Sequence, residues 1–237
     1  MLTFTKSNKK KCKPVKKLSL MLIDCHIHSS RYSACSVITP QRICELAVQR
    51  GLEVIVLTEH QVQWLKPELD QLRGANPDLK IFSGVEVSVA EGYDIVVIAE
   101  NKSLFFPYGI SFLELREELS YLANPYFLFI AHPFRYHNAR TQEMVEILAQ
   151  VDGIEMNSVN ILRGQVNRKN NEFLPLNFRT YLEAQKNSGL IPIYNSDAHS
   201  ESSVGAIANL IDTDKAPKSE TQLAELLPPE QWIQVRV

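Results

Sequence analysis

Short apolar runs rich in β-branched residues alternate with amphipathic stretches over most of the chain. Runs of this kind predict buried strands, and the amphipathic stretches between them predict helices. The predicted strands are Leu20–His28, Leu52–Thr58, Lys80–Val87, Asp94–Ala99, Tyr126–Ala131, Gly153–Asn157 and Leu190–Asn195, with Val204–Ile211 as a candidate eighth strand.

The clearest predicted helix lies in "TPQRICELAVQRG", where Thr39 can cap the first turn, Pro40 suits that turn and Gly51 ends the helix. The other predicted helices are Leu113–Leu122, Thr141–Gln150, Phe178–Ser188 and Glu220–Leu226. Because strands and helices take turns, the pattern predicts an α/β fold with a parallel sheet and helices outside it. Periodicity alone leaves a closed barrel and an open doubly wound sheet as alternatives.

The composition is typical of a soluble globular protein, because 45% of the 237 residues are hydrophobic and 22% are charged. We find no internal repeat and no linker, so residues 20–237 are predicted to form a single domain. No window approaches the ~20 apolar residues of a membrane span, and "LSLMLI" is too short for a secretory signal. We therefore expect a cytoplasmic protein with no membrane partner.

The charge is distributed unevenly along the chain. Residues 1–19 hold seven lysines and no acidic residue, whereas the formal net charge of the whole chain is -2. The remainder is therefore acidic. We interpret the basic tail as a solvated terminus, with a nucleic-acid-binding arm as the alternative.

Polar residues capable of metal binding follow the predicted strands. The first strand ends in "IDCHIHSS", and strict alternation would place Asp24, His26 and His28 on one face. Later strands end in or near further such residues, namely Glu59, His60, Glu86, His132, Asp197 and His199. Because the carboxyl ends of parallel strands lie at one edge, five of the six histidines should converge.

Such a cluster of buried ionisable groups would be costly without counter-ions, so the pattern predicts bound divalent cations. Imidazole and carboxylate ligands suit manganese, iron or zinc, and ligand type does not choose among them. The cysteines give no disulfide framework. We expect Cys25 and Cys44 to fill the core and Cys35 to lie in a loop near the histidines.

The motifs "DCHIHSSRYS", "GLEVIVLTEH", "GVEVS", "IAHPFR", "GIEMNS" and "NSDAHS", in this order, resemble the polymerase and histidinol phosphatase (PHP) family from Leu20 to about Ile211. The resemblance implies a distorted seven-stranded (β/α) barrel, similar to a TIM barrel, with two or three metal ions at the carboxyl ends of its strands. The activity implied is hydrolysis of phosphate esters.

Carried over by motif, the resemblance places His26, His28, Glu86 and Asp197 around a first ion. Glu86 would bridge to a second ion that also binds His132, and His60 and His199 would hold a third. Asp24 and Glu59 would lie behind the ligands or act as partial ligands, with Asp24 counted among the catalytic residues.

Three positions depart from the family pattern. Many members read "YSDG" in the first loop, where the aspartate helps to bind the third ion, and this chain has Tyr32-Ser33-Ala34-Cys35. Many carry a histidine on the strand after "GVEVS", for which Asp94 is a candidate substitute. Glu59 in "TEH" replaces the commoner aspartate.

The mechanism expected is attack on phosphorus by water activated between metal ions. Arg135 is the first candidate to hold a phosphate oxygen and Arg31 the second, and His199 is a candidate acid for the leaving group. The expected substrate is a small phosphorylated metabolite or a nucleotide.

Three alternatives stay open at the level of sequence. An amidohydrolase-type barrel also opens with H-x-H, although such barrels usually have a bridging lysine where this chain has Glu86. A degenerate, non-catalytic barrel could bind a ligand or partner. A nuclease is compatible with the motifs, but the acidic body argues against a broad phosphate-binding face.

Overall fold

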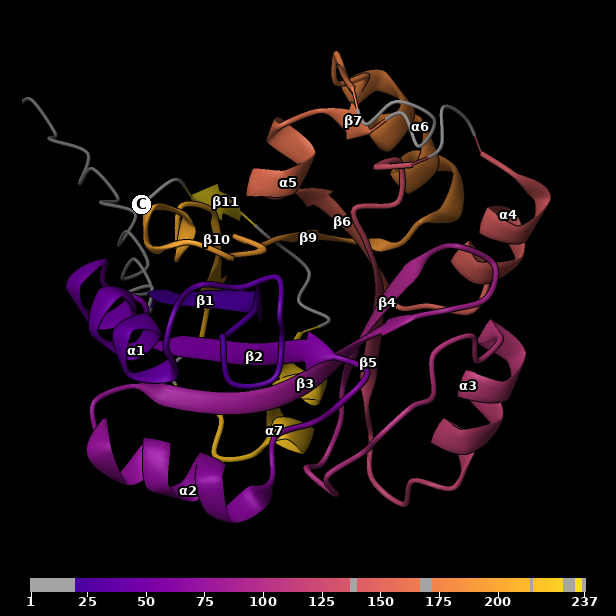
Figure 1. Cartoon of the computed structure of the whole chain (residues 1–237). Coiled ribbons are helices and arrows are strands. Elements are labelled where there is room, and N and C mark those ends of the chain that lie inside the picture. The colour runs from indigo at the N-terminus through magenta and orange to yellow at the C-terminus, as the bar shows by residue number, and fades with distance from the viewer. Residues whose placement is uncertain (1–19, 137–139, 167–171, 214, 228–232, 236–237) are drawn as a thin grey trace, which may run out of the picture.

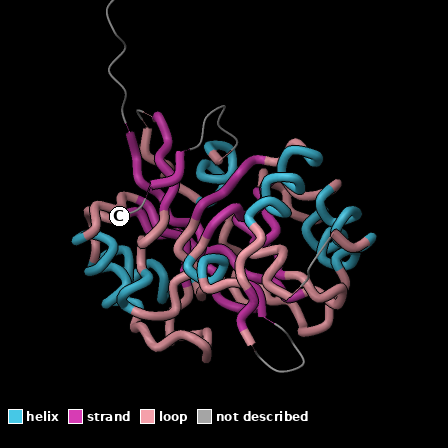
Figure 2. Tube along the Cα trace, turned by 90° about the horizontal axis from the view of Figure 1, so that it is seen from above, coloured by secondary structure: helices cyan, strands magenta, loops and turns pink. Residues whose placement is uncertain are grey.

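The computed structural model describes residues 20–136, 140–166, 172–213, 215–227 and 233–235 (Figure 1). The basic tail predicted over residues 1–19 lies outside the described residues. Helices surround a central, curved sheet, as the view from above shows (Figure 2).

All seven predicted strands are present. They are β1 (Leu20–Ile27), β2 (Val54–His60), β3 (Lys80–Ser88), β4 (Asp94–Ile98), β5 (Phe127–Ala131), β6 (Gly153–Asn157) and β9 (Ile191–Tyr194). They follow one another in this order in the sheet, and β10 (Ala208–Asp212) and β11 (Ile233–Val235) extend it beyond β1. A parallel bridge between Ile27 and Ala198 brings the segment after β9 back to β1, so the barrel is nearly closed. The predicted barrel class is confirmed.

The expectation of a wholly parallel sheet is wrong at two strands. Strand β4 runs antiparallel to both β3 and β5, and β10 runs antiparallel to β1. The connection from β3 to β4 is a tight turn in which Val89 N donates to Tyr93 O and Gly92 has a φ of 85°. A turn this short can join only antiparallel neighbours, because a parallel crossover needs a dozen or more residues.

The helices are α1 (Pro40–Gln49), α2 (Lys66–Ala75), α3 (Phe112–Ser120), α4 (Gln142–Leu148), α5 (Val159–Leu162), α6 (Phe178–Ser188) and α7 (Glu220–Leu226), with a 3₁₀ turn at Glu201–Ser203. A small hairpin, β7 (Gln165–Val166) and β8 (Phe173–Leu174), follows α5. Helix α2 escaped prediction because it buries only Leu69 and Leu72 and its N-cap, Leu65, makes no side-chain hydrogen bond. Every helix in the described part of the chain is too short or too polar to cross a bilayer.

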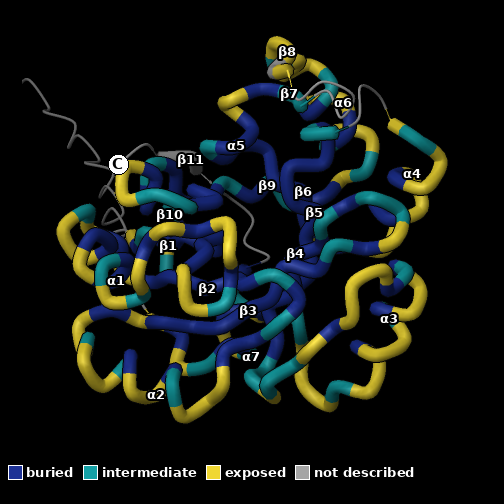
Figure 3. The backbone as a smooth tube through the Cα atoms, viewed as in Figure 1, coloured by how far each residue is buried: buried dark blue, intermediate teal, exposed yellow. Residues whose placement is uncertain are grey.

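The core has an inner and an outer part. Inside the barrel, Ile23, Val54, Phe82 and Phe129 belong to one buried cluster with residues of α7. Outside it, two further clusters pack the other faces of the strands against α1 and α2 and against α3, α4 and α6. The strands are accordingly buried along most of their length, and exposed residues gather on the helices and loops (Figure 3).

The alternation predicted for β1 breaks down near its end. Cys25 belongs to the inner cluster, yet the ring of the next residue, His26, also faces inward and lies 6.3 Å from that of Phe129. Ile27 packs on the outer side. The pairing of β1 with β2 shifts register between Asp24 and Ile27, which is a β-bulge that re-aims the side chains. Asp24 therefore does not share a face with His26 and His28.

Candidate metal centre

The cluster of histidines and carboxylates forms at one rim of the barrel. His26 and His28 come from the end of β1, His60 from β2, Glu86 from β3, and His132, Asp197 and His199 from the segments that follow β5 and β9. Asp94 reaches the same rim because β4 runs in the opposite direction. The structure thus brings together side chains separated by more than a hundred residues in sequence.

Four groups of these side chains offer ligand atoms that all lie within 4.8 Å of one another. They are His26–His28–Glu86, His26–His132–Asp197, Glu86–Asp94–His132 and His28–His60–His199. Glu86 belongs to two of the groups, and its two oxygens lie 3.1 Å from His132 Nε2 and 3.0 Å from His60 Nδ1. This position suits a carboxylate that bridges two ions.

The Nε2 atoms of His26 and His28 face each other at a distance that requires a positive charge between or beside them. Nδ1 of His26 donates to Glu155 Oε1 at 3.1 Å, and Nδ1 of His28 donates to Ser33 Oγ at 3.2 Å. Each ring therefore has its lone pair on its own Nε2 atom, and these two Nε2 atoms are only 3.0 Å apart. A proton or a metal ion must lie between or beside them, because two acceptors repel each other.

Unpartnered carboxylate oxygens point to the same conclusion. Glu86 and Asp197 are 1% and 2% exposed, yet Glu86 Oε2 and Asp197 Oδ1 make no hydrogen bond within the described residues. Imidazole nitrogens lie near both oxygens, with His60 Nδ1 3.0 Å from Glu86 Oε2 and His199 Nδ1 3.4 Å from Asp197 Oδ1, but none of them donates a well-directed hydrogen bond. Because buried polar atoms are nearly always satisfied, the arrangement suits a cation between the carboxylates and the imidazoles. The nitrogen and oxygen donors fit divalent transition metals.

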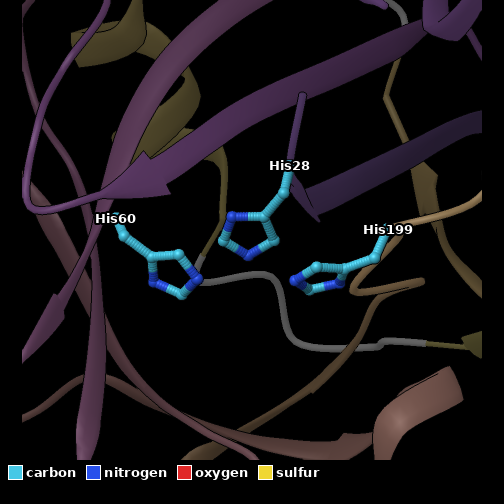
Figure 4. A group of neighbouring side chains, drawn as sticks. All are labelled: His28, His60 and His199. Carbon is cyan, nitrogen blue, oxygen red and sulfur yellow. The ribbon is translucent and has the colours of Figure 1, made fainter. Parts of the chain in front are cut away.

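The third group is shown in Figure 4, where the imidazoles of His28, His60 and His199 converge from three segments of the chain. The ring of His28 lies between the others, with centroids 4.5 Å from His60 and 4.4 Å from His199. Nδ1 of His199 lies 3.0 Å from the backbone oxygen of Asp197, which accepts its proton and leaves Nε2 free as a ligand or an acid.

Burial and charge pairing shift the ionisation of the cluster. Burial lowers the pKa of His28 to about 4, so this imidazole is neutral at pH 7 and can bind a metal. Burial opposes the charged forms of His60 and His132, but the Glu86 carboxylate outweighs it and raises their pKa values to about 11 and about 8. Burial likewise opposes the charge of Asp197, yet His26 and His132 lower its pKa to about 2.

Glu155 lies near the end of the sixth predicted strand, but sequence reasoning gave it no role at the site. It is fully buried on β6, where Oε1 accepts from His26 Nδ1 and Asn195 Nδ2, and Oε2 accepts from the backbone N of His132 at 3.0 Å. A carboxylate behind a metal-binding histidine fixes its tautomer and orientation. The signal in the sequence was a glutamate within the otherwise apolar strand "GIEMN".

Asp24 and Glu59 lie behind the cluster and belong to none of the four groups. Asp24 accepts from the backbone N of Ser196 at 3.0 Å, and burial raises its pKa to about 7. Glu59 accepts from Ser29 Oγ and Ser33 Oγ, each at 2.5 Å, and so anchors the hydroxyl that orients His28. Both side chains position the loops that carry the ligands.

Two of the cluster residues have left-handed backbone conformations. His132 has a φ of 28° and Asp197 a φ of 48°. Such values are strained for residues with a Cβ and are concentrated at functional sites. Asn160 Nδ2 donates to Asp197 Oδ2 at 2.5 Å and holds that carboxylate in place.

A cavity of about 580 Å³ opens above the cluster, and its lining includes Arg135, Cys35, His60 and His199. Arg31 does not line it, because its guanidinium pairs with Glu68 at 2.6 Å on the surface. Burial of the Cys35 thiol opposes its ionisation, but hydrogen bonds with His199 and His60 prevail and lower its pKa to about 6. Cys25 and Cys44 are buried, as expected.

The fold and the rim define a TIM-like barrel with a candidate metal centre at the ends of its strands. The model of the PHP domain family matches residues 24–171, and the chain therefore belongs to the PHP domain family. No curated protein matches the chain at the level of sequence.

Solved structures from bacteria and an archaeon share the fold at 16% identity. PsfC from Pseudomonas syringae has a TM-score of 0.66, with 93% of each chain covered. A two-domain protein from Bacteroides vulgatus that contains a predicted PHP-like metal-dependent phosphoesterase has a TM-score of 0.69, with 99% of this chain and 70% of that chain covered. The lesion-specific endonuclease PfuEndoQ from Pyrococcus furiosus has a TM-score of 0.61, with 91% of this chain and 58% of that chain covered.

Proposed function

We propose that the protein is a metal-dependent phosphoesterase that hydrolyses the phosphate ester of a small phosphorylated metabolite or nucleotide. The observation that carries the proposal is the pair of facing Nε2 atoms of His26 and His28, 3.0 Å apart, beside the unpartnered oxygens of Glu86 and Asp197. These atoms lie at the rim where Arg135 also reaches the cavity.

Each proposed ion position follows from the donor atoms. His26, His28, Glu86 and Asp197 would hold one ion, Glu86 and His132 with Asp94 a second, and His60 and His199 a third. Bound divalent ions would supply positive charge for the phosphoryl oxygens and make water a stronger nucleophile at neutral pH. The residues fit two or three such ions, with manganese, zinc and iron as candidates.

The protein's own residues would orient the ester. The guanidinium of Arg135 can hold a phosphoryl oxygen that does not react, since arginine binds phosphate through paired N–H donors. Because Nδ1 of His199 is engaged by the backbone oxygen of Asp197, Nε2 is the ring nitrogen that can bind a metal or carry a proton for the leaving group. The roles of metal ligand and leaving-group acid therefore compete at His199. We assign it as a ligand.

The size of the cavity supports a small substrate. Its volume of about 580 Å³ falls within the range of ~300–1,000 Å³ typical of small-molecule pockets. Tyr93 lines the cavity, and its hydroxyl is held by Thr141 Oγ1 at 2.8 Å, so this side of the pocket has a defined shape.

The test is an assay of phosphorylated metabolites and nucleotides with metal-stripped protein reloaded with manganese, zinc or iron. We expect metal-dependent release of phosphate, which His26→Ala or Asp197→Ala should abolish while the protein stays folded. Glu53→Gln is the matched control, since Glu53 is exposed at the opposite end of β2. A metal-loaded wild type that hydrolyses none of these esters would contradict the proposal.

Action on DNA is the second candidate, favoured by the likeness to PfuEndoQ. The same metal-loaded protein should be assayed on duplex DNA with an abasic site, with Asp197→Ala as the control for the metal centre. Asp197-dependent cleavage of DNA, together with inactivity on small esters, would establish this candidate in place of the first. Inactivity on both, with no metal bound on elemental analysis, would favour a non-catalytic barrel.

A further inference from the structure

Gln61, the residue that follows β2, makes a hydrogen bond with each of its four polar groups and is 1% exposed. Its backbone N donates to Glu86 O at 2.9 Å, and its backbone O accepts from Phe106 N at 2.8 Å. In the side chain, Nε2 donates to Pro107 O at 3.2 Å and Oε1 accepts from Ser88 N at 2.9 Å. One residue thus joins the end of β2 to the end of β3 and to the segment after β4.

The contacts of Gln61 lead to candidate metal ligands on both sides. His60 directly precedes it, and the His60 ring faces that of His28 at the rim (Figure 4). Ser88, whose backbone N reaches Gln61 Oε1, donates through its own Oγ to Asp94 Oδ1 at 2.5 Å. The amide of Gln61 therefore connects the strand that carries His60 to the turn that carries Asp94.

The backbone of Gln61 is a second, independent sign of a special position. Its φ of 63° lies in the left-handed region, which is uncommon for a residue with a Cβ. Such a conformation persists where the surrounding contacts over-determine it, and it is concentrated at functional sites. The four hydrogen bonds supply those contacts, and the chain turns out of β2 immediately after His60.

We propose that Gln61 is a positioning residue of the metal centre, whose side-chain amide fixes His60 and Asp94 relative to each other before metal binds. The inference rests on the metal centre of the proposed function, and it concerns the second and third ion positions. The first ion should be affected less, because Gln61 reaches Glu86 through a backbone hydrogen bond that side-chain substitutions retain. Loss of a group that orients metal ligands lowers metal affinity by about 10–100-fold.

Gln63 is the matched control, because it is also a buried glutamine whose amide is fully hydrogen-bonded. Its side chain makes hydrogen bonds to the backbone of four residues, namely Ser83, Ala99, Lys102 and Leu104. None of these four belongs to the groups of candidate ligands in the described residues. Gln63→Ala should therefore lower stability as Gln61→Ala does, without changing the binding of ions.

The experiment titrates zinc into the metal-stripped wild type, Gln61→Ala, Gln61→Gly and Gln63→Ala proteins in competition with a chromogenic chelator. Chemical denaturation of the metal-free proteins gives their stabilities. In Gln61→Ala we expect the weaker binding steps to lose about tenfold or more in affinity, while the tightest step, which we assign to the first ion, stays close to wild type. Gln63→Ala should unfold more easily and bind zinc as the wild type does.

Gln61→Gly separates the amide from the backbone. Glycine adopts the left-handed conformation without strain, so this variant should be more stable than Gln61→Ala. Because it also lacks the amide, it should show the same loss of zinc affinity. It remains informative if Gln61→Ala fails to fold.

The outcomes separate this inference from the proposed function. Wild-type zinc affinity at every step in Gln61→Ala or in Gln61→Gly, or an equal loss in Gln63→Ala, would overturn the role of the Gln61 amide and leave the metal centre intact. Failure of the stripped wild type to bind zinc, manganese or iron would overturn the metal centre and the proposed function together.

Discussion

Glu155 offers the most direct test of how the barrel prepares a metal ligand. Its Oε1 accepts from His26 Nδ1 at 3.1 Å and from Asn195 Nδ2 at 3.0 Å, and its Oε2 accepts from the backbone N of His132 at 3.0 Å. Glu155→Gln preserves the shape of the side chain but leaves only one acceptor oxygen. Whichever way the amide is turned, at least one N–H then faces another donor.

The expected cost follows from these contacts. A buried donor that loses its acceptor costs about 1–3 kcal/mol, and removal of a carboxylate behind a metal-binding histidine lowers metal affinity or activity by about 10–100-fold. The affinity loss corresponds to about 1.4 to 2.8 kcal/mol of binding free energy. We therefore expect the loss in metal affinity to appear together with a modest fall in the free energy of unfolding.

The assay is competition for zinc against a chromogenic chelator, run on wild type and Glu155→Gln, with chemical denaturation of both metal-free proteins. Glu53→Gln, which removes an exposed carboxylate, should match the wild type in both measurements. If Glu155→Gln binds zinc as tightly as the wild type, the carboxylate does not prepare His26 for an ion. The argument that Glu155 keeps the proton of His26 on Nδ1, and so leaves Nε2 to bind an ion, would then be refuted.

Four further outcomes follow from the structure. Arg135→Ala should raise KM about tenfold or more while kcat changes less, because the charge-assisted hydrogen bond lost to the phosphoryl oxygen contributes about 1.5–3 kcal/mol. Steady-state kinetics on the preferred ester would measure both constants. Gly84→Ala should lower the free energy of unfolding by about 1–3 kcal/mol in denaturation, since the added Cβ would lie 2.8 Å from Val97 O. Removal of a metal present at about a hundredfold over its Kd should lower stability by about 2.7 kcal/mol, visible as a lower Tm after chelation. Zinc added at pH 7 in weak buffer should acidify the solution, because His60 and His132, whose pKa values are raised to about 11 and about 8, must release their protons to bind the metal. An unchanged pH would contradict this.

Much of the architecture could be predicted because it depends on local patterns. Seven predicted apolar runs became seven of the nine strands of the sheet, and the capping pattern around Thr39 and Pro40 became helix α1. The convergence of histidines followed from a general rule, since the carboxyl ends of parallel strands share one edge. These predictions needed only periodicity and residue type.

The features that escaped prediction depend on tertiary pairing. The bulge that separates Asp24 from His26 arises in the register between β1 and β2, which alternation along one strand does not reveal. Glu155 resembles any polar residue in a strand until folding places His26 and His132 against it. Neither signal exists before the strands are paired.

Strand direction explains how Asp94 reaches the rim although it starts its strand. Because β4 is antiparallel to β3, Asp94 pairs in register with Ser88, the last residue of β3, whose hydroxyl donates to Asp94 Oδ1 at 2.5 Å. Oδ2 lies 3.7 Å from His132 Nδ1, too far for a hydrogen bond. One carboxylate oxygen is therefore anchored and the other is directed toward His132 and Glu86, which is how a ligand is held in readiness for an ion. The reversal of β4 thus brings the first residue of a strand to the rim, because the rim is formed by the last residues of the neighbouring parallel strands.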